Sequence, residues 1–162
     1  MSPRRSRQHA ARRQRGAALI ESLVAAFILG LGLLGMAGLQ AKTMKATRSS
    51  EFRSQAVMLS YYMLDVLRTD RTQALAGQYN TASSGDLPLN KACSASSFSG
   101  STLADNARKD WIDSLKKNLG DSSSTCGAIY CHVNSECVIQ IFWDDTLAGG
   151  EGTQSFATRS RI

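Results

Sequence analysis

Hydrophobic residues follow two different patterns in the N-terminal part of the chain. Positions 17–39 are almost continuously apolar, and the clearly polar side chains there are Glu21 and Ser22. Positions 40–68 contain no proline or glycine, and their apolar residues recur mostly on one helical stripe. A helix over 17–68 would be about 78 Å long, apolar all round in its first half and amphipathic in its second. We expect the stripe to lie in a core; it consists of Met44, Phe52, Leu59, Met63, Val66 and Leu67.

The middle of the chain predicts a loop followed by a second helix. The residues beyond Arg71 are rich in serine, glycine, asparagine and threonine, which favours a loop. Apolar residues then recur every four positions, which predicts a helix from Thr102 to Leu119, capped by Ser101 or Thr102 and ended by Gly120. We expect one buried face, formed by Leu103, Ala107, Trp111, Leu115 and Leu119.

The C-terminal positions have the composition of β-strands. Residues 137–143 are rich in β-branched and aromatic side chains, and residues 156–162 alternate in part. We expect a glycine-rich hairpin loop at 144–153 and a third strand at 129–133. The fold class is therefore α+β, with a long N-terminal helix packed on a small antiparallel β-sheet head and an additional short helix.

Charge is distributed unevenly along the chain. The formal net charge is +6, but the first sixteen positions contain six arginines and no acid, and the remainder carries thirteen basic and thirteen acidic residues. A protein that binds duplex nucleic acid needs a basic face that neutralises several phosphates. We therefore expect no nucleic-acid partner. The six arginines are Arg4, Arg5, Arg7, Arg12, Arg13 and Arg15.

The apolar segment is long enough to cross a membrane. A helix of 23 residues covers about 35 Å, and the hydrocarbon core of a bilayer is about 30 Å thick. Arginines on the N-terminal side would hold that end in the cytoplasm. We expect a basic leader at 1–16, a transmembrane half-helix at 17–40, an amphipathic half-helix at 41–71 and an outward-facing globular head at 72–162.

Four cysteines lie in the predicted head. In an oxidising compartment, an even number of cysteines in a small domain indicates two disulfides, and the sequence allows three pairings without choosing among them. Zinc binding is the alternative, because three of the cysteines lie close to His132, but their spacing matches no familiar zinc pattern. The disulfide candidates are Cys93, Cys126, Cys131 and Cys137, and no metal is expected.

The order of the N-terminal elements favours an apolar helix that is kept after processing. An ordinary signal peptide places its apolar stretch before the cleavage site and loses it. Here Arg15-Gly16 stands directly before the apolar run, so a cut after Gly16 would make that run the mature N-terminus. The alternatives are an ordinary signal peptide cut at 37–41 and a twin-arginine signal, whereas a lipoprotein signal lacks its cysteine.

Glu21 is the most informative side chain of the apolar run. An ionisable group inside a membrane helix is costly and usually marks a site with a partner. A cut after Gly16 would create an α-ammonium on Ala17, at a helix end that already carries partial positive charge. Burying that ammonium is unfavourable unless a carboxylate meets it. If helices stack with an axial stagger, Glu21 of one subunit can pair with Ala17 of the next and set the register.

Arg15-Gly16, the short apolar pair that follows, Leu19-Ile20-Glu21 and the retained helix together resemble the class III signal of type IV prepilins and their pseudopilin relatives. The resemblance implies that the prepilin peptidase, a membrane aspartyl protease, cuts between Gly16 and Ala17 and N-methylates Ala17. It also implies that Glu21 is the assembly carboxylate and that the head is pilin-like. The chain departs from the family in having alanine, and not phenylalanine, as its first mature residue.

The residues from Glu21 to Ala26 and from Leu29 to Gln40 are similar to the minor pilins of the type IV pilus modification (PilV) group. The resemblance implies a structural subunit that helps to assemble or prime a type IV pilus, with no cofactor and no catalytic residues. The implied partners are the prepilin peptidase, other major and minor pilins through the N-terminal helix, the inner-membrane assembly platform and, before assembly, membrane lipid. The implied location is the bacterial inner membrane, with the head in the periplasm, and then the pilus at the cell surface.

Three other interpretations remain as alternatives. A minor pseudopilin of a type II secretion system would share the N-terminal segment. A secreted or membrane-tethered enzyme would need a site such as Cys131-His132 beside Asp144 and Asp145, but no hydrolase or phosphate-loop motif occurs. Asp144, Asp145 and Glu151 could bind calcium, but their spacing is not that of an EF-hand, and turn chemistry is the simpler interpretation.

Overall fold

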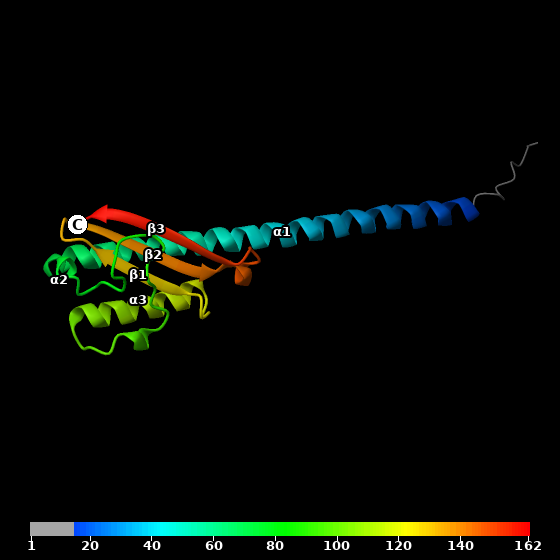
Figure 1. Cartoon of the computed structure of the whole chain (residues 1–162). Coiled ribbons are helices and arrows are strands. Elements are labelled where there is room, and N and C mark those ends of the chain that lie inside the picture. The colour runs from blue at the N-terminus through cyan, green and yellow to red at the C-terminus, as the bar shows by residue number, and fades with distance from the viewer. Residues whose placement is uncertain (1–14) are drawn as a thin grey trace, which may run out of the picture. The chain divides into compact units, whose positions relative to one another are not determined.

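The computed structural model of the chain describes residues 15–162. The chain divides into two compact units, Met1–Thr43 and Met44–Ile162, and helix α1 (Arg15–Thr69) contributes to both. The expected classes of element are present: a long N-terminal helix, a shorter helix and a small antiparallel sheet (Figure 1). The elements after α1 are α2 (Arg71–Leu75), η1 (Ala95–Ser97), α3 (Leu103–Leu119), β1 (Cys126–Cys131), β2 (Glu136–Asp144), η2 (Asp145–Ala148) and β3 (Thr153–Arg161).

The sheet has three antiparallel strands in the order β1-β2-β3, so β2 is central. The first strand was expected at 129–133, but β1 begins at Cys126 and ends at Cys131. Val133 lies in the turn to β2 and is 89% exposed. The turn begins this early because the backbone N–H of His132 donates to the carbonyl of Glu136 at 2.7 Å and Ser135 adopts a positive φ of 73°. The hairpin loop expected at 144–153 contains the short helix η2.

One face of the sheet packs against the second part of α1 and against α3. Alternate residues of β2 point to this face, as the two-residue period of a strand requires. Trp111 is completely buried here, and its indole N–H donates to the carbonyl of Leu59 at 3.0 Å. Gly127 of β1 leaves room for it, because a Cβ at this position would lie 2.3 Å from the Trp111 ring. The fully buried members of this core include Met63, Leu64, Leu67, Ile112, Leu115, Leu119, Ile129, Ile139 and Ile141.

The other face of the sheet is covered by the segment between α2 and η1. Val138 and Phe142 of β2 pack there against Ala82 and Leu89. Gln140 is also buried, and its side-chain carbonyl accepts the backbone N–H of Leu89 at 2.9 Å. Burial of the amide is tolerated because this hydrogen bond satisfies its oxygen.

The same covering segment closes the free edge of β1. Ala92 and Gly127 exchange two backbone hydrogen bonds of 2.8 and 2.9 Å. The N–H groups of Ile129 and Cys131 donate to the Thr81 hydroxyl and the Asn80 amide oxygen, at 2.8 and 2.7 Å. An unpaired strand edge is a template for pairing with other chains. Side chains of the covering segment therefore accept the N–H groups of Ile129 and Cys131, and these groups of the edge strand are not left open for another chain.

Helix α3 begins with a capping box. The Thr102 side chain accepts from the N–H of Asp105, and the Asp105 carboxylate accepts from the N–H of Thr102. The hydrogen bond from Thr102, followed by that from Arg108, holds the pKa of Asp105 below its ordinary value, while desolvation opposes this effect. Of the two caps considered above, the structure has Thr102, and Gly120 follows the last helical residue.

Three expectations about the helices were wrong. Leu103 is 68% exposed, because a four-residue spacing rotates by about 40° per step around a helix and carries Leu103 out of the face of Leu119. Met44 is 71% exposed, because it precedes the part of α1 that the sheet covers. The residues just beyond Arg71 form the short helix α2 before the loop begins at Gly77, where φ is +79°.

Candidate functional site

The first part of α1 presents an apolar surface that nothing in the described chain covers. From Ala18 to Thr43 every side chain is exposed, apart from the intermediate position Gly30. Leu19, Ile20 and Leu23 are each about 70% exposed. By length and composition, α1 is the one helix among residues 15–162 that is able to cross a membrane. An apolar surface of this extent indicates a lipid or protein environment.

Glu21 is the single acid on this surface. It is exposed and has no hydrogen-bond or ion-pair partner among the residues that the structure describes. Ser22, its polar neighbour, donates its hydroxyl to the carbonyl of Leu19 at 2.9 Å. The serine is therefore satisfied within its own helix wherever the helix goes. The carboxylate needs an external partner once water is removed.

The predicted cleavage site lies in the first turn of α1. Gly16 and Ala17 have helical backbone, but the side chain of Ala17 and positions 1–14 of the leader lie outside the described residues. The cut, the new α-ammonium and its methylation therefore stay predictions. Ala17 and Glu21 are four residues apart, a spacing that places both on one helix face.

The glycines of the apolar segment have no neighbour in the chain that requires them. A Cβ at Gly30, Gly32, Gly35 or Gly38 would meet no atom within 4 Å beyond the helix itself. Glycine is common in membrane helices and costs about 1 kcal/mol relative to alanine in a helix interior. Packing within the described chain does not explain these four residues.

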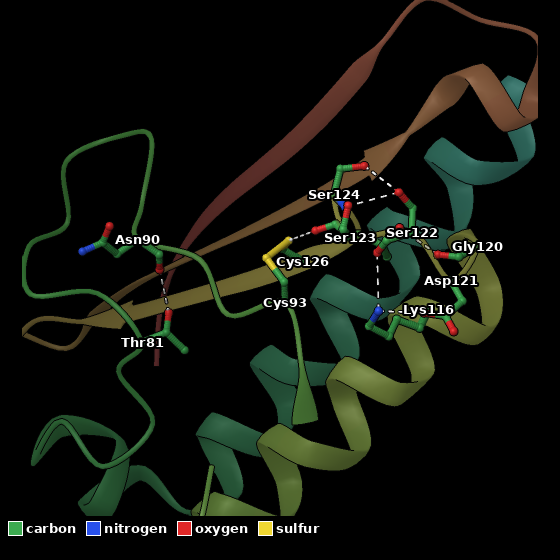
Figure 2. The surroundings of a disulfide bond; sticks show 11 residues. Thr81, Asn90, Cys93, Lys116, Gly120, Asp121, Ser122, Ser123, Ser124 and Cys126 are labelled. Atoms are coloured by element: carbon green, nitrogen blue, oxygen red, sulfur yellow. Dashed lines mark hydrogen bonds and ion pairs between the residues drawn. A yellow bond between two sulfur atoms is a disulfide. The ribbon is translucent and has the colours of Figure 1, made fainter. Parts of the chain in front are cut away.

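The four cysteines form the two expected disulfides. Cys93 is bonded to Cys126, so the end of the covering segment is fastened to the start of β1 (Figure 2). Cys131 is bonded to Cys137, its direct partner across the β1–β2 hairpin. In these disulfides none of the four cysteines offers the thiolate that a zinc ligand needs. For the same reason Cys131 does not present a thiolate to His132.

A run of serines lies beside the disulfide between Cys93 and Cys126 (Figure 2). Figure 2 shows Ser122, Ser123 and Ser124 in the turn that leads from α3 into β1. The Ser124 N–H donates to the Ser122 hydroxyl at 3.2 Å, and the Lys116 ammonium donates to the Ser122 carbonyl at 3.4 Å and to Asp121 at 2.7 Å. The polar atoms near this disulfide are therefore used to build the turn.

The acidic residues after β2 have structural partners. The Asp144 carboxylate accepts the N–H of Thr146 at 3.0 Å and caps η2. Asp145 is only 5% exposed, and its carboxylate accepts the Ser49 hydroxyl at 2.7 Å and the Trp143 indole N–H at 3.3 Å. Among the described residues no group of three or more metal-binding side chains occurs. Turn chemistry and a contact with α1 account for both aspartates.

The contact between Ser49 and Asp145 was missed in the sequence analysis. The two residues are 96 positions apart, and neither belongs to a recognisable motif. They join η2 to α1 inside the second unit. Gly149 packs beside this contact against the Lys45 side chain.

Comparison with known proteins did not add a family: no protein-family model, no curated protein and no solved structure matches this chain.

Proposed function

We propose that this chain is a minor type IV pilin, a structural subunit that the prepilin peptidase cuts after Gly16 and that is built into a pilus through α1. The observation that carries the proposal is Glu21, a carboxylate without a partner among the described residues, on a fully exposed apolar helix surface. The carboxylate follows the predicted new N-terminus by one helical turn. The disulfide-bonded α+β head agrees with the pilin-like head that the resemblance implies.

The assembly step follows from the chemistry of these groups. Before assembly the apolar surface of α1 lies in the bilayer, whose hydrocarbon core of about 30 Å matches the length of the apolar segment. In the fibre, neighbouring helices cover that surface. The Ala17 ammonium of one subunit and the Glu21 carboxylate of its neighbour then neutralise each other where water is scarce. An axial shift of one helix would break this ion pair and leave both charges buried. The pair therefore selects the axial stagger between neighbouring helices.

Replacement of Glu21 tests the assembly role. We expect Glu21→Gln, which keeps the size and removes the charge, to be processed and inserted normally but to be depleted at least about tenfold in sheared pili. Glu51→Gln is the matched control, because Glu51 is also an exposed glutamate of α1 but lies beyond the apolar run. Normal incorporation of Glu21→Gln would overturn the assembly role.

The N-terminus of the membrane-extracted protein tests the processing step. N-terminal sequencing and intact mass should show a chain that begins at Ala17, carries one methyl group and contains two disulfides. A chain that begins near position 40 would overturn the proposal, because the apolar helix would then be lost. Deletion of the gene separates the pilin from a pseudopilin: the proposal predicts loss of pili or twitching, whereas loss of exoprotein secretion would favour the pseudopilin.

A further inference from the structure

A basic pocket lies where η2 meets α1. Its volume is about 620 Å³, which lies within the range of about 300–1,000 Å³ that is typical of small-ligand sites. All of its lining residues belong to the second compact unit, so the pocket is formed within one body. They are Met44, Lys45 and Arg48 of α1 together with Thr146, Ala148 and Gly149.

The two cations of the pocket are available for a ligand. Lys45 and Arg48 are exposed, and neither forms an ion pair with a residue that the structure describes. The opposing turn carries Asp144, Asp145 and Glu151, and the carboxylates of Asp144 and Asp145 accept their hydrogen bonds from neutral groups. Asp145 is moreover almost completely buried. A guanidinium and an ammonium on one side of a pocket are suited to an anion such as phosphate.

The position of Lys45 is defined by the backbone beneath it. Gly149 has a φ of +84°, and a Cβ there would lie 2.8 Å from both Cγ and Cδ of Lys45. The aliphatic stem of Lys45 therefore lies directly against Gly149. The side chain of Met44, which is 71% exposed, adds an apolar wall beside the two charges. The pocket thus combines cations with apolar surface, the two features of a phospholipid near its headgroup.

The chain connects this pocket closely to the apolar segment. Lys45 follows Leu39, the last residue of the apolar run, by six positions. Six helical residues rise about 9 Å, and even a fully extended chain of six residues spans no more than about 22 Å. The headgroup layer adds about 5–8 Å on each side of the hydrocarbon core.

We propose that this pocket binds the phosphate of an anionic phospholipid while the subunit is held in the membrane. The inference rests on the membrane-inserted state of the proposed function. Phosphatidylglycerol fits the two cations because its headgroup carries no compensating ammonium, unlike phosphatidylcholine. Lys45 and Arg48 donate to the phosphate oxygens, and Met44 contacts the glycerol and the start of the acyl chains. The bound lipid holds the subunit at the membrane surface until assembly.

Lipid binding to the full-length protein tests the inference. The protein in neutral detergent micelles is titrated with phosphatidylglycerol or phosphatidylcholine, and bound lipid is counted by native mass spectrometry. We expect the double variant Lys45→Gln/Arg48→Gln to lose about thirtyfold in affinity for phosphatidylglycerol, since each basic residue contributes about fivefold. Lys42→Gln/Arg53→Gln is the control, because it removes the same charge from α1 but neither residue lines the pocket, so its loss of affinity should be clearly smaller than that of the pocket variant.

Two results would overturn the inference. One is an equal loss in both double variants, which indicates a general attraction to a basic helix. The other is equal binding of the two lipids by the unaltered protein. The variant Glu21→Gln should retain phosphatidylglycerol binding while failing to enter pili. Failure of lipid binding and failure of the pilin proposal are therefore distinguished by separate measurements.

Discussion

The two parts of α1 belong to one continuous helix but have different surroundings. From Ala18 to Thr43 the apolar side chains are exposed on all sides. In the second part, Ala56, Met63, Leu64 and Leu67 are completely buried against the sheet and α3. Both parts are helical, although the head covers only the second. What each part can do depends on the solvent or partner that its surface meets.

Removal of the disulfide between Cys93 and Cys126 should give the largest loss of stability among these predictions. The loss should be confined to the head and to the second part of α1 that the head covers. The double variant Cys93→Ala/Cys126→Ala opens a link between residues 33 positions apart and should lower the stability of the head. The expected cost is about 4 kcal/mol by loop entropy. Denaturation in nonionic detergent, followed by Trp fluorescence, measures this loss, and circular dichroism should show that the helix in the micelle persists.

The second disulfide is the control for that prediction. Cys131 and Cys137 are only six positions apart, so their removal should cost about 2 kcal/mol by the same loop-entropy argument. Equal losses for the two pairs would contradict the role assigned to the covering segment. A simultaneous loss of the helix in the micelle would show that the two parts of α1 are not independent.

A pair of identical substitutions compares the two parts of α1 directly. Leu64→Ala removes a completely buried side chain and should destabilise the head by about 3 kcal/mol. Leu33→Ala removes a side chain that is 68% exposed and should leave unfolding of the head unchanged. Chemical denaturation of the two full-length variants in the same detergent makes the measurement. A similar loss of stability for both variants would mean that burial of Leu64 in the head does not explain its contribution.

The smallest loss of stability is expected for changes in the capping box of α3, the helix that packs with the second part of α1 in the core of the head. Thr102→Ala should cost about 1 kcal/mol, because it removes the side-chain acceptor of an otherwise unpaired N–H. The contribution of the Asp105 carboxylate to the stability of the head should depend on pH. Its pKa in the folded protein lies below the ordinary 3.8, chiefly through the Thr102 hydrogen bond, so its contribution is present above pH 3.8 and is lost as the pH falls through the folded value.

Unfolding at two pH values tests the direction of that effect. At pH 7, Asp105→Asn should be less stable than the unaltered protein, and the difference should shrink near pH 3. Asp113→Asn is the control, because Asp113 is an exposed aspartate of the same helix outside the capping box. A difference for Asp105→Asn that is constant with pH would contradict the capping role of the carboxylate.

Much of the fold could be predicted from local patterns. The end of α1, the limits and cap of α3, and the positions of β2 and β3 lie within a few residues of the expectations. Helical periodicity, capping residues and β-branched runs are local signals, and these elements follow them. The errors arose where a local pattern was extended to burial, as for Leu103 and Met44, which the tertiary structure leaves exposed.

Of the candidate site, the position of Glu21 within the apolar run could be predicted from the sequence, whereas its role stays a prediction. Glu21 and the apolar run lie on a described helix, and the position of the carboxylate among apolar residues needed no tertiary information. The cut between Gly16 and Ala17 remains a prediction, because it depends on another protein. The basic pocket could not be predicted, since Lys45 and Gly149 are distant in sequence and meet only after the head has folded.

The sequence by itself determined the apolar helix, its single acid, the class of the fold and the number of disulfides. Only the tertiary structure decided how the cysteines pair, which segment covers the edge of β1, and that Ser49 meets Asp145. The physical reason is the range of the interactions. Backbone hydrogen bonds and hydrophobic periodicity act within a few residues, whereas these contacts join groups that are close only when the sheet and helices have packed.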